Sequence, residues 1–334
     1  MRSYHATPGA GIAGLRVEEH PIPEPRPTEA LVRVHAAALN YRELLVLRDS
    51  YPLPLKPDLI PVSDGAGEVV AVGSGVTRVS AGERVAAAIF PRWLAGPFTM
   101  DVADQLGGSR DGMLTEYAAL PEEALVRVPD HVSYAEAATL PCAAVTAWHA
   151  LTGGRGLRPG ETVLTLGSGG VSLFALQFAQ LFGARVIATT GSEDKVKRLR
   201  ALGAAHVLNY RRTPAWSEQV RELTAGAGAD LVVEVAGTLE QSLAAVARDG
   251  QIAFVGMLDN QPAAVEQRAL WLSGATVRPV AVGSRAHFTE MLRAIDAHRL
   301  TPVIDRVFPF AEAPAAYRYF ETARPFGKVV IAHG

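Results

Sequence analysis

A glycine-rich turn in the middle of the chain carries the sharpest chemical signal. Residues 163–180, VLTLGSGGVSLFALQFAQ, join an apolar strand pattern to an apolar helix pattern through a run of small residues. In this setting the first glycine makes the tight turn, and the next lets the backbone approach a pyrophosphate at the helix N-terminus. Ser172 stands where the third glycine of the pattern would fall, and a plain flexible connector is the alternative. We predict that five residues bind the pyrophosphate of a dinucleotide: Gly167, Ser168, Gly169, Gly170 and Val171.

The strand that follows this turn ends without an acidic residue. Its sequence RVIATT runs into Gly191, whereas a site for NAD usually has an Asp or Glu at this tip to bind the ribose hydroxyls. We therefore expect NADP(H) to be preferred to NAD(H). The polar residues available to a 2′-phosphate are Thr190, Ser192, Lys195 and Tyr210. The alternative makes Ser192 a helix N-cap and Lys195 a solvated helix residue.

The elements that must position these residues follow two different sequence patterns. Between residues 30 and 129, short β-branched runs are separated by Gly and Pro, which predicts a compact, barrel-like β-domain. Between residues 162 and 282, short apolar strands alternate with longer helix patterns, which predicts βαβ units around a parallel sheet. Residues 91–112 read as a long loop, either a lid or pocket wall or a plain surface excursion.

The last part of the chain returns to a mixed pattern. An amphipathic helix is expected near residues 286–298 and another helix within 310–321, and the strand GKVVIA follows them. These elements can rejoin the first domain and make it discontinuous. We expect a catalytic domain of residues 1–127 and 284–334, and a dinucleotide-binding domain of residues 128–283.

Composition narrows the functional classes. The chain has 334 residues, 49% hydrophobic and 20% charged, with a net charge of −2 and no block of like charges. We therefore expect no nucleic-acid or membrane partner. The N-terminal sequence lacks the apolar core of a signal peptide, and a single cysteine, Cys142, excludes an internal disulfide. A reducing cytoplasm is the expected location.

Several motifs, in order along essentially the whole chain, resemble the medium-chain dehydrogenase/reductase superfamily. They are LNYRELLVLRDSYP, IPVSDGAGEVVAVGSGV, AATLPCAAVTAWHAL, TLGSGGVSLFALQFA, ALGAAHVLNYR and FGKVVI. The chain looks closest to the zinc-free, quinone-oxidoreductase-like branch, in a subgroup described as alcohol-dehydrogenase-like. The resemblance implies a Rossmann domain with a doubly wound parallel sheet and a discontinuous GroES-like β-barrel catalytic domain.

The resemblance also assigns roles to individual residues. It implies that Asn40 and Thr146 lie near the nicotinamide and that Lys328, in the closing motif, reaches the cofactor from the catalytic domain. Read without the resemblance, Asn40 is a turn residue that ends a strand, and Lys328 is an exposed lysine at a strand edge. Both alternatives stay open at this point.

The zinc-dependent branch of the superfamily provides a contrast. Its catalytic metal is held by a cysteine, a histidine and a second cysteine, and the corresponding residues here are Asn40, Ser63 and Cys142. One soft ligand cannot hold zinc in an open catalytic site, which needs three protein ligands. We therefore expect no catalytic zinc, and we expect Cys142 to be a small buried apolar residue. Asp64, His35 and His149 are the remaining conceivable ligands. Asp64 can as easily cap its turn, His149 is expected to pack between helix and sheet, and His35 is expected to be structural.

Without a metal, negative charge that develops on a substrate needs a hydrogen-bond or proton donor. Tyr41 and Tyr51 lie in the segment LNYRELLVLRDSYP, and Arg48 between them offers a positive charge. These three are the candidate catalytic residues. A tyrosine in an apolar run also serves as a core residue with a satisfied hydroxyl, so the structural alternative stays open.

These features predict an NADPH-dependent oxidoreductase that transfers hydride to a quinone, an enone or a similar activated carbonyl without a metal. A zinc-free alcohol or aldehyde dehydrogenase is one alternative, and a non-catalytic nucleotide-binding protein is another. The segment ATVRPVAVG, residues 275–283, alternates apolar residues at strand spacing near the end of the nucleotide domain. An exposed apolar edge strand favours pairing with a second copy, and such pairing occurs in the family. We expect a homodimer.

Overall fold

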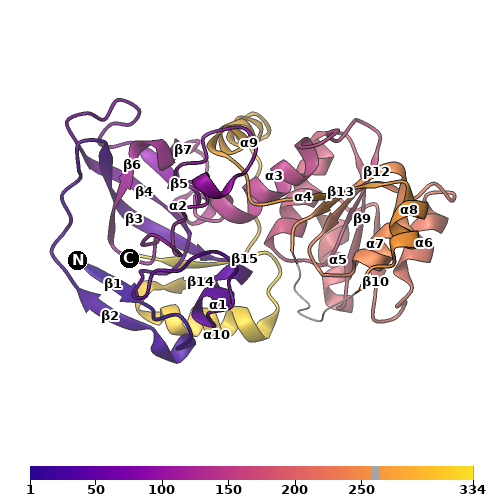
Figure 1. Ribbon diagram of the computed structural model, residues 1–334, viewed down its shortest axis with the longest axis horizontal. Helices are drawn as coiled ribbons and strands as arrows, with labels where there is room; N and C mark the ends of the chain where they lie inside the picture. Colours follow the sequence, from indigo (N-terminus) through magenta and orange to yellow (C-terminus); the bar gives the residue numbers. More distant parts are fainter. Residues whose placement is uncertain (257–263, 334) are drawn as a thin grey trace. The chain divides into compact units, whose positions relative to one another are not determined.

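The computed structural model describes residues 1–256 and 264–333 and divides into two compact units. One unit comprises Met1–Val145 and Gly283–Gly334, and the other comprises Thr146–Val282 (Figure 1). Residues 128–145, which the sequence analysis assigned to the nucleotide domain, pack with the first unit. The reason is that helix α2 (Tyr134–Ala137) contacts strands β3 (Glu29–Leu39) and β4 (Asp64–Val72) of that unit.

The second unit is built on a six-stranded, all-parallel sheet with the order β10-β9-β8-β11-β12-β13. This confirms the predicted doubly wound parallel sheet. The order reverses at β8, so crossovers on its two sides place helices on opposite faces of the sheet. The strands are β8 (Thr162–Thr165), β9 (Arg185–Thr190), β10 (His206–Asn209), β11 (Ala229–Glu234), β12 (Val246–Phe254) and β13 (Thr276–Pro279).

The helices of the second unit cover a sheet whose central strands are buried on both faces. All four residues of β8 are buried, as expected for a strand that reads as a continuous apolar run. Helix α4 packs on β8 and β9, and α7 packs on β11 and β12. The helices are α3 (Val145–Thr152), α4 (Gly170–Leu181), α5 (Glu193–Ala201), α6 (Trp216–Leu223), α7 (Leu239–Ala245) and α8 (Gln267–Ser273).

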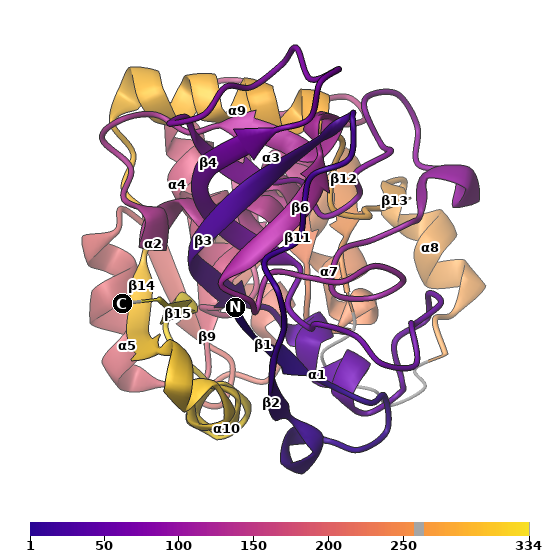
Figure 2. The ribbon, with the colours of Figure 1, turned by 90° about the vertical axis from the view of Figure 1, so that its left-hand side faces the viewer.

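The first unit contains a seven-stranded sheet in which β6 pairs with β3 beside the path β14-β15-β3-β4-β5-β7. All of its pairs are antiparallel except β14 with β15. Figure 2 shows β3, β4 and β6 side by side. The strands are β3 (Glu29–Leu39), β4 (Asp64–Val72), β5 (Arg84–Ala87), β6 (Tyr117–Pro121), β7 (Leu125–Arg127), β14 (Ile304–Pro309) and β15 (Lys328–Ala332).

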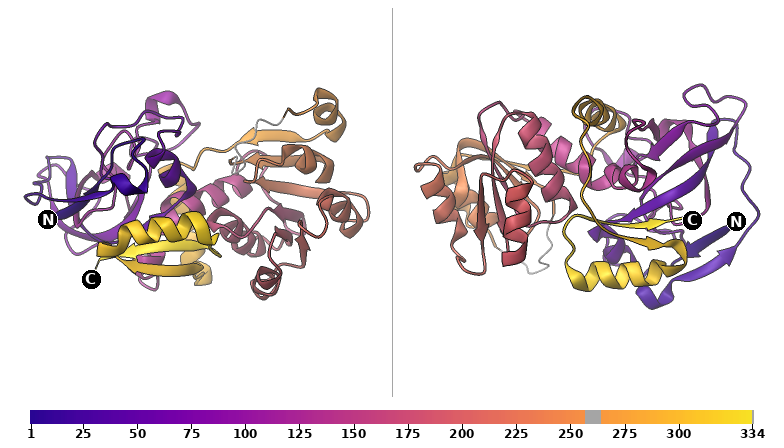
Figure 3. Two further views of the ribbon diagram at one scale, coloured as in Figure 1. Left: turned by 90° about the horizontal axis from the view of Figure 1, so that it is seen from below. Right: turned by 180° about the vertical axis from the view of Figure 1, so that it is seen from behind.

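The end of the chain completes this sheet. Strand β15 pairs antiparallel with β3, so residues 328–332 lie against the N-terminal part of the chain. Figure 3 shows these last elements, drawn yellow, beside the indigo strands. The remaining helices are α1 (Tyr41–Leu47), α9 (Arg285–His298) and α10 (Ala313–Ala323), with a π-helical segment at Leu140–Ala144. Helix α10 packs on both β14 and β15.

Two smaller features complete the first unit. Strands β1 (Arg2–His5) and β2 (Arg16–Glu19) form a separate two-stranded antiparallel sheet. Residues 91–112 hold no helix or strand other than one short 3-10 turn at Met100–Val102. The fully buried Trp93 anchors this loop through ring contacts with Phe90 and Phe98. Among the described residues, no helix is long and apolar enough to cross a membrane.

Candidate functional site

The glycine-rich turn of the second unit connects β8 to α4. Gly167 has φ = 79°, a backbone conformation that L side chains rarely adopt, and its N–H donates to Thr189 Oγ1 at 3.1 Å. Gly169 is the N-cap of α4, and no side chain caps the helix there. A Cβ placed on Gly167 or on Gly169 would meet no atom within 4 Å. The turn therefore presents uncapped helix N–H groups to open space, which suits an anionic ligand.

Ser172 explains how the turn departs from the three-glycine pattern. Its hydroxyl is buried and donates to the carbonyl oxygen of Leu166 at 2.6 Å. The Ser172 side chain thus bonds to the end of β8, which a glycine at this position would approach closely. Serine in place of the third glycine therefore keeps β8 and α4 in contact through a hydrogen bond.

The end of β9 lies beside the turn, because β9 and β8 are neighbours in the sheet. Thr190 is buried, and its Oγ1 accepts the N–H of Ser192 at 3.2 Å. Ser192 is the N-cap residue of α5, but its side chain makes no capping hydrogen bond. The hydroxyl is therefore not committed to the helix, contrary to the simple N-cap alternative. Lys195 lies in the first turn of α5.

Tyr210 covers the glycine at this tip. Its N–H donates to the carbonyl oxygen of Thr190 at 3.0 Å, and its phenol packs so closely on Gly191 that a Cβ there would clash with the ring. Glu193 is the nearest acid, but its carboxylate accepts from Asn209 Nδ2 at 3.0 Å and lies 3.5 Å from Arg212 Nε. The structure thus brings together Thr190, Ser192 and Tyr210 at one tip.

Glu234, at the end of β11, is a buried acid near the turn that the sequence analysis did not single out. It is completely buried, and its Oε1 accepts the backbone N–H groups of Ala236 and Gly237 at 2.8 and 2.9 Å. Its Oε2 accepts from the hydroxyls of Thr238 and Ser242. Because β11 neighbours β8, this carboxylate shapes the loop next to the glycine-rich turn. An acid at the end of an apolar strand, LVVEVAG, is the available sequence signal.

In the first unit, Lys328 lies at the start of β15, in the interior of the sheet between β14 and β3. The alternative of an exposed lysine at a strand edge is therefore wrong: Lys328 is only 2% exposed. Its Nζ donates to the carbonyl oxygen of Leu39 at 2.8 Å and to Asn40 Oδ1 at 2.5 Å, and lies 3.6 Å from Asp64 Oδ2. Burial of an ammonium group requires such partners.

A chain of hydrogen bonds leads from Asp64 into the α1 helix. Ser63 Oγ lies 2.9 Å from Asp64 Oδ1 and 3.0 Å from Glu43 Oε1. Glu43 Oε1 also accepts from Arg42 Nη1 at 2.9 Å. Burial disfavours the charge on Arg42, but the Glu43 carboxylate, together with Tyr51 and Cys142, more than offsets burial and raises the pKa of that guanidinium. We call this set the buried polar cluster; its members are Asn40, Arg42, Glu43, Ser63, Asp64 and Lys328.

The buried polar cluster contains polar atoms that no described residue satisfies. Asn40 Nδ2 and Glu43 Oε2 are buried without a hydrogen-bond partner among the described atoms. Asn40 is the N-cap of α1, yet its side chain makes no capping bond. A buried donor without a partner is uncommon in native proteins and indicates a ligand or water. Asn40 therefore fits a residue that bonds to a bound cofactor.

The backbone beside this cluster is strained. Val62 has φ = 71°, which is a genuine outlier for a β-branched residue. Its carbonyl oxygen accepts the N–H of Met113 at 2.7 Å, and Gly107 and Gly112 press against its backbone. Such strain persists only where surrounding contacts enforce it, and it is concentrated at functional sites. Val62 comes directly before Ser63 and before Asp64, the first residue of β4.

The three positions that correspond to zinc ligands carry Asn40, Ser63 and Cys142, whose surroundings test whether they fit a zinc ion. Asn40 and Ser63 are bonded within the buried polar cluster, to Lys328 and Asp64. Cys142 lies in the π-helical segment and is half-buried rather than fully buried as expected. Burial of the sulfur, with the nearby Asp64 carboxylate, raises the pKa of the Cys142 thiol to about 12. An amide, a hydroxyl and a protonated thiol beside a lysine ammonium are a poor donor set for zinc.

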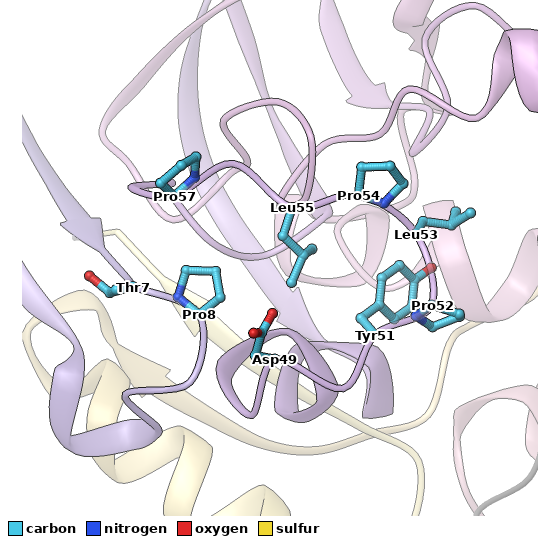
Figure 4. A pocket seen from close by; sticks show the side chains of 9 residues that line it. All are labelled: Thr7, Pro8, Asp49, Tyr51, Pro52, Leu53, Pro54, Leu55 and Pro57. Atoms are coloured by element: carbon cyan, nitrogen blue, oxygen red, sulfur yellow. The ribbon is translucent and has the colours of Figure 1, made fainter.

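The candidate catalytic residues have three different settings. Tyr51 lines a surface hollow of about 550 Å³, and the Arg42 guanidinium lies 4.8 Å from its ring centroid. Figure 4 shows Tyr51 and Pro52 on one side of the hollow, with Thr7 and Pro8 on the other. Burial raises the pKa of the Tyr51 phenol, against the opposing effect of Arg42.

Tyr41 and Arg48 lie at the two ends of helix α1. Tyr41 is partly buried and packs against the hydrophobic core of the first unit. Arg48 is exposed, and its guanidinium forms an ion pair with Glu321 Oε1 at 2.6 Å. The structure therefore does not bring Arg48 together with Tyr51. Arg42, which the sequence analysis passed over, supplies the guanidinium beside that phenol.

The remaining predicted residues have well-defined surroundings. Thr146 is buried near the start of α3. His149 Nδ1 lies 3.1 Å from the carbonyl oxygen of Val282, and His149 Nε2 lies 3.2 Å from Arg278 Nη1. His35 stacks on Tyr134 with ring centroids 4.2 Å apart. His149 thus has hydrogen-bond partners on both ring nitrogens, and His35 has a stacking partner.

Comparison with known proteins supports an oxidoreductase. Residues 26–130 match the alcohol dehydrogenase GroES-like domain, and residues 170–297 match the family described as zinc-binding dehydrogenase. The chain is 41% identical to a zinc-type alcohol dehydrogenase-like protein of Schizosaccharomyces pombe, over 96% of both chains. It is 33% identical to a quinone oxidoreductase of Pseudomonas aeruginosa, over 95% of both chains.

Solved structures agree with these relatives. A putative alcohol dehydrogenase from Sinorhizobium meliloti superposes with a TM-score of 0.92 at 40% identity, over 99% of this chain and 98% of that one. An NAD-dependent alcohol dehydrogenase gives a TM-score of 0.90 at 37% identity, over the whole of both chains. A mycobacterial protein complexed with NADPH gives a TM-score of 0.84 at 27% identity, over 99% of this chain and all of that one. The chain belongs to the medium-chain dehydrogenase/reductase superfamily and is an oxidoreductase with a GroES-like domain and a Rossmann domain.

Proposed function

We propose that this protein is an NADPH-dependent reductase of quinones, enones or similar activated carbonyl compounds, and that it works without a catalytic metal. The observation that carries the proposal is the Lys328 ammonium, buried and bonded to Asn40 beside Asp64. Hydrogen bonds fix the Lys328 ammonium next to Asn40. Asn40 is one of the positions that correspond to metal ligands in the zinc-dependent branch.

The chain's own residues are suited to holding the dinucleotide. The uncapped N-terminus of α4 and the open glycines of the turn would bind the pyrophosphate, and the unpartnered Asn40 Nδ2 would bond to the nicotinamide end. Lys328 supplies positive charge beside Asn40. The bound cofactor supplies the hydride. The protein contributes orientation and electrostatic stabilisation.

The poor metal-ligand set favours activated substrates. Reduction of a simple aldehyde concentrates negative charge on one oxygen, which zinc enzymes stabilise with the metal. A quinone or an enone spreads the charge over a conjugated system and so needs less local stabilisation. Hydrogen-bond donors are then sufficient.

Tyr51 is the donor that we propose for this charge. A phenol is protonated at neutral pH, and burial, which raises the pKa of Tyr51, favours that form further, so the hydroxyl can donate a hydrogen bond. Tyr51→Phe is expected to lower kcat by about 10²-fold, the lower range for a positioned proton donor. Tyr41→Phe is the matched control, because Tyr41 packs on the core at the other end of the same segment. Equal losses in the two variants would contradict the assignment.

The NADPH preference rests on the tip of β9. The tip offers Ser192 and Tyr210 and has no carboxylate within Thr190-Gly191-Ser192, while Glu193 is bonded to Asn209. Similar structures include both a complex with NADPH and an NAD-dependent enzyme, so affinity measurement decides the matter. Titration of the protein fluorescence with each cofactor should give the tighter binding for NADPH, and equal affinities would contradict it.

An activity panel tests the substrate class. The purified protein is supplied with NADPH and a series of quinones, enones and simple aldehydes, and cofactor oxidation is followed by absorbance. We expect turnover with the quinones and enones and little with the aldehydes. The second candidate, a zinc-free alcohol or aldehyde dehydrogenase, is favoured by the names of several relatives. Faster turnover of aldehydes than of every quinone would select it.

We also propose a homodimer that pairs through β13. This strand is the last in the parallel sheet, so one of its edges has no partner strand within the described chain. The neighbouring helix α8 exposes three apolar residues: Leu270, Trp271 and Leu272. An open edge strand next to apolar surface favours association with a second copy. Light scattering at micromolar concentration should give the mass of a dimer, and a monomer would contradict the proposal.

A further inference from the structure

The small β1–β2 sheet gathers metal-binding side chains on one face. Side chains alternate between the faces of a strand, so Ser3 and His5 lie on the same side of β1. The register pairs Ser3 with Glu18 and His5 with Arg16, and it places these partners on that side too. His20 follows β2 by one residue and continues the alternation. Two imidazoles and a carboxylate therefore share one face by the spacing of the sequence.

Their ligand atoms converge. His5 Nε2 lies 3.0 Å from His20 Nε2, and Glu18 Oε2 lies 4.0 Å from the first and 3.9 Å from the second. Tetrahedral zinc with ligands about 2.0–2.2 Å away separates its donor atoms by similar lengths. Within the residues that the structure describes, no other three or more His, Cys, Asp or Glu residues have ligand atoms that all lie within 4.8 Å of one another.

A second layer of contacts holds these groups in the required state. His5 Nδ1 faces Asp58 Oδ1 at 3.0 Å, so the proton belongs on Nδ1 and the lone pair on Nε2 points to the other ligands. A carboxylate behind a ligating imidazole is the usual outer partner of a zinc-bound histidine. Arg16 donates to Glu18 Oε1 and to Asp58 Oδ1, both at 2.7 Å, which leaves Glu18 Oε2 directed at the histidines.

The charge of the cluster also suits a cation. Arg16 contributes one positive charge, and Glu18 and Asp58 contribute two negative charges, so the group is anionic when both histidines are neutral. His5 is buried, while His20 and Glu18 are about one-third exposed. An ion can therefore reach the ligands from solvent, and water or the Ser3 hydroxyl, 3.1 Å from His5 Nε2, can complete the coordination.

We propose that His5, Glu18 and His20 bind a divalent transition-metal ion, with zinc the best match to two imidazoles and one carboxylate. The site lies on the β1–β2 sheet and is built from residues outside the buried polar cluster and the glycine-rich turn. A two-stranded sheet is marginally stable by itself, so an ion that bridges both strands would stabilise it. The expected role is structural.

Zinc titration of the full-length protein tests this proposal. The protein carries no polyhistidine tag and is first dialysed against a chelator, and Zn²⁺ is then added in a calorimeter. We expect one ion per chain and a rise in the thermal unfolding temperature that grows with zinc concentration. Glu18→Gln keeps the side-chain size, and His20→Ala removes an imidazole; each is expected to lower the zinc affinity about tenfold or more.

Two controls separate this site from other ligands. His298→Ala removes an exposed histidine at the end of α9, and Cys142→Ser removes the only thiol; both should leave one ion per chain with unchanged affinity. Circular dichroism checks that the variants are folded. If His20→Ala fails to fold, Glu18→Gln decides the result. No saturable binding, or equal affinity in the unmodified protein and in Glu18→Gln, would overturn the proposal.

Discussion

The glycine-rich turn and the buried polar cluster are built by opposite means. The turn consists of consecutive residues whose backbone N–H groups we propose as the cofactor-binding groups. Gly167 and Gly169 leave the space in front of these groups open because they have no side chain. The cluster depends on side chains brought together from distant parts of the chain: Lys328 and Asn40 are 288 positions apart. The turn presents open, uncapped N–H groups, whereas the cluster buries its charges and pairs most of them.

This contrast shows what a local pattern can encode. A strand, a glycine turn and a helix N-terminus follow one another in the sequence, so their chemistry can be read in one window. The cluster exists only because β15 pairs with β3 and β3 with β4, which places Lys328 and Asp64 on either side of Asn40. Substitutions should therefore affect ligand binding at the turn, and both folding and activity at the cluster.

The largest effect is expected for Lys328→Met. The substitution keeps an unbranched side chain but removes the ammonium, so Asp64 loses its buried counter-charge. Breaking a buried ion pair from one side costs about 3–5 kcal/mol of stability. Urea unfolding followed by circular dichroism measures the loss.

A second substitution sharpens this test. Asp64→Asn in the Lys328→Met background removes the unpaired charge, and it should recover part of the lost stability. The two changes would then be less than additive. A loss of unfolding free energy under about 1 kcal/mol in Lys328→Met would show that Lys328 and Asp64 are not coupled. The buried polar cluster would then behave like a set of independent surface ion pairs.

A smaller effect is expected at the tip of β9. Lys195→Ala should narrow the affinity difference between NADPH and NADH by about 1–3 kcal/mol, since a charge-assisted bond to phosphate is stronger than a neutral one. Lys197→Ala is the matched control, because Lys197 lies on the same helix and is exposed. Fluorescence titration with both cofactors measures the difference, and an equal change in the two variants would point to a general loss of charge.

Much of the second unit could be predicted from the sequence. Short stretches of consecutive residues were enough to predict the parallel sheet, the glycine-rich turn and the absence of an acid after β9. The structure shows the strands in the expected places. Glu234 was missed because its partners are backbone N–H groups of a loop, and no side-chain pattern announces them. Strand β13 ends at Pro279, earlier than the pattern suggested.

The first unit shows where such prediction stops. Arg48 was chosen for its place between two tyrosines, but helix α1 directs it to Glu321 on the surface. Arg42, six positions earlier, is the guanidinium that reaches the Tyr51 ring. Lys328 is buried because β15 is an interior strand, and strand order in an antiparallel sheet depends on pairing between distant segments.

A change of about tenfold in cofactor affinity is expected for Gly167→Ala. Its φ of 79° strains any L residue, and the added methyl group enters the open space in which we propose that the pyrophosphate binds. Gly183→Ala is a closely matched control, with φ = 68° and equally open surroundings at the far end of α4. Both variants should lose similar stability, and only Gly167→Ala should lose affinity for NADPH in a fluorescence titration. An equal affinity for NADPH in both variants would show that the turn is not part of the binding site.

The smallest effect, no change in turnover, is expected on chelation. Asn40 and Ser63 are bonded to Lys328 and Asp64, and the raised pKa of Cys142, about 12, disfavours its thiolate, so these positions are a poor donor set for zinc. Incubation with a strong chelator, followed by assay with NADPH and a quinone, should leave kcat unchanged. Zinc proposed at His5, Glu18 and His20 could be removed in the same treatment, and it would alter the unfolding temperature while turnover stayed constant. A parallel loss of zinc and turnover, restored by adding zinc back, would contradict the metal-free mechanism and favour an alcohol dehydrogenase.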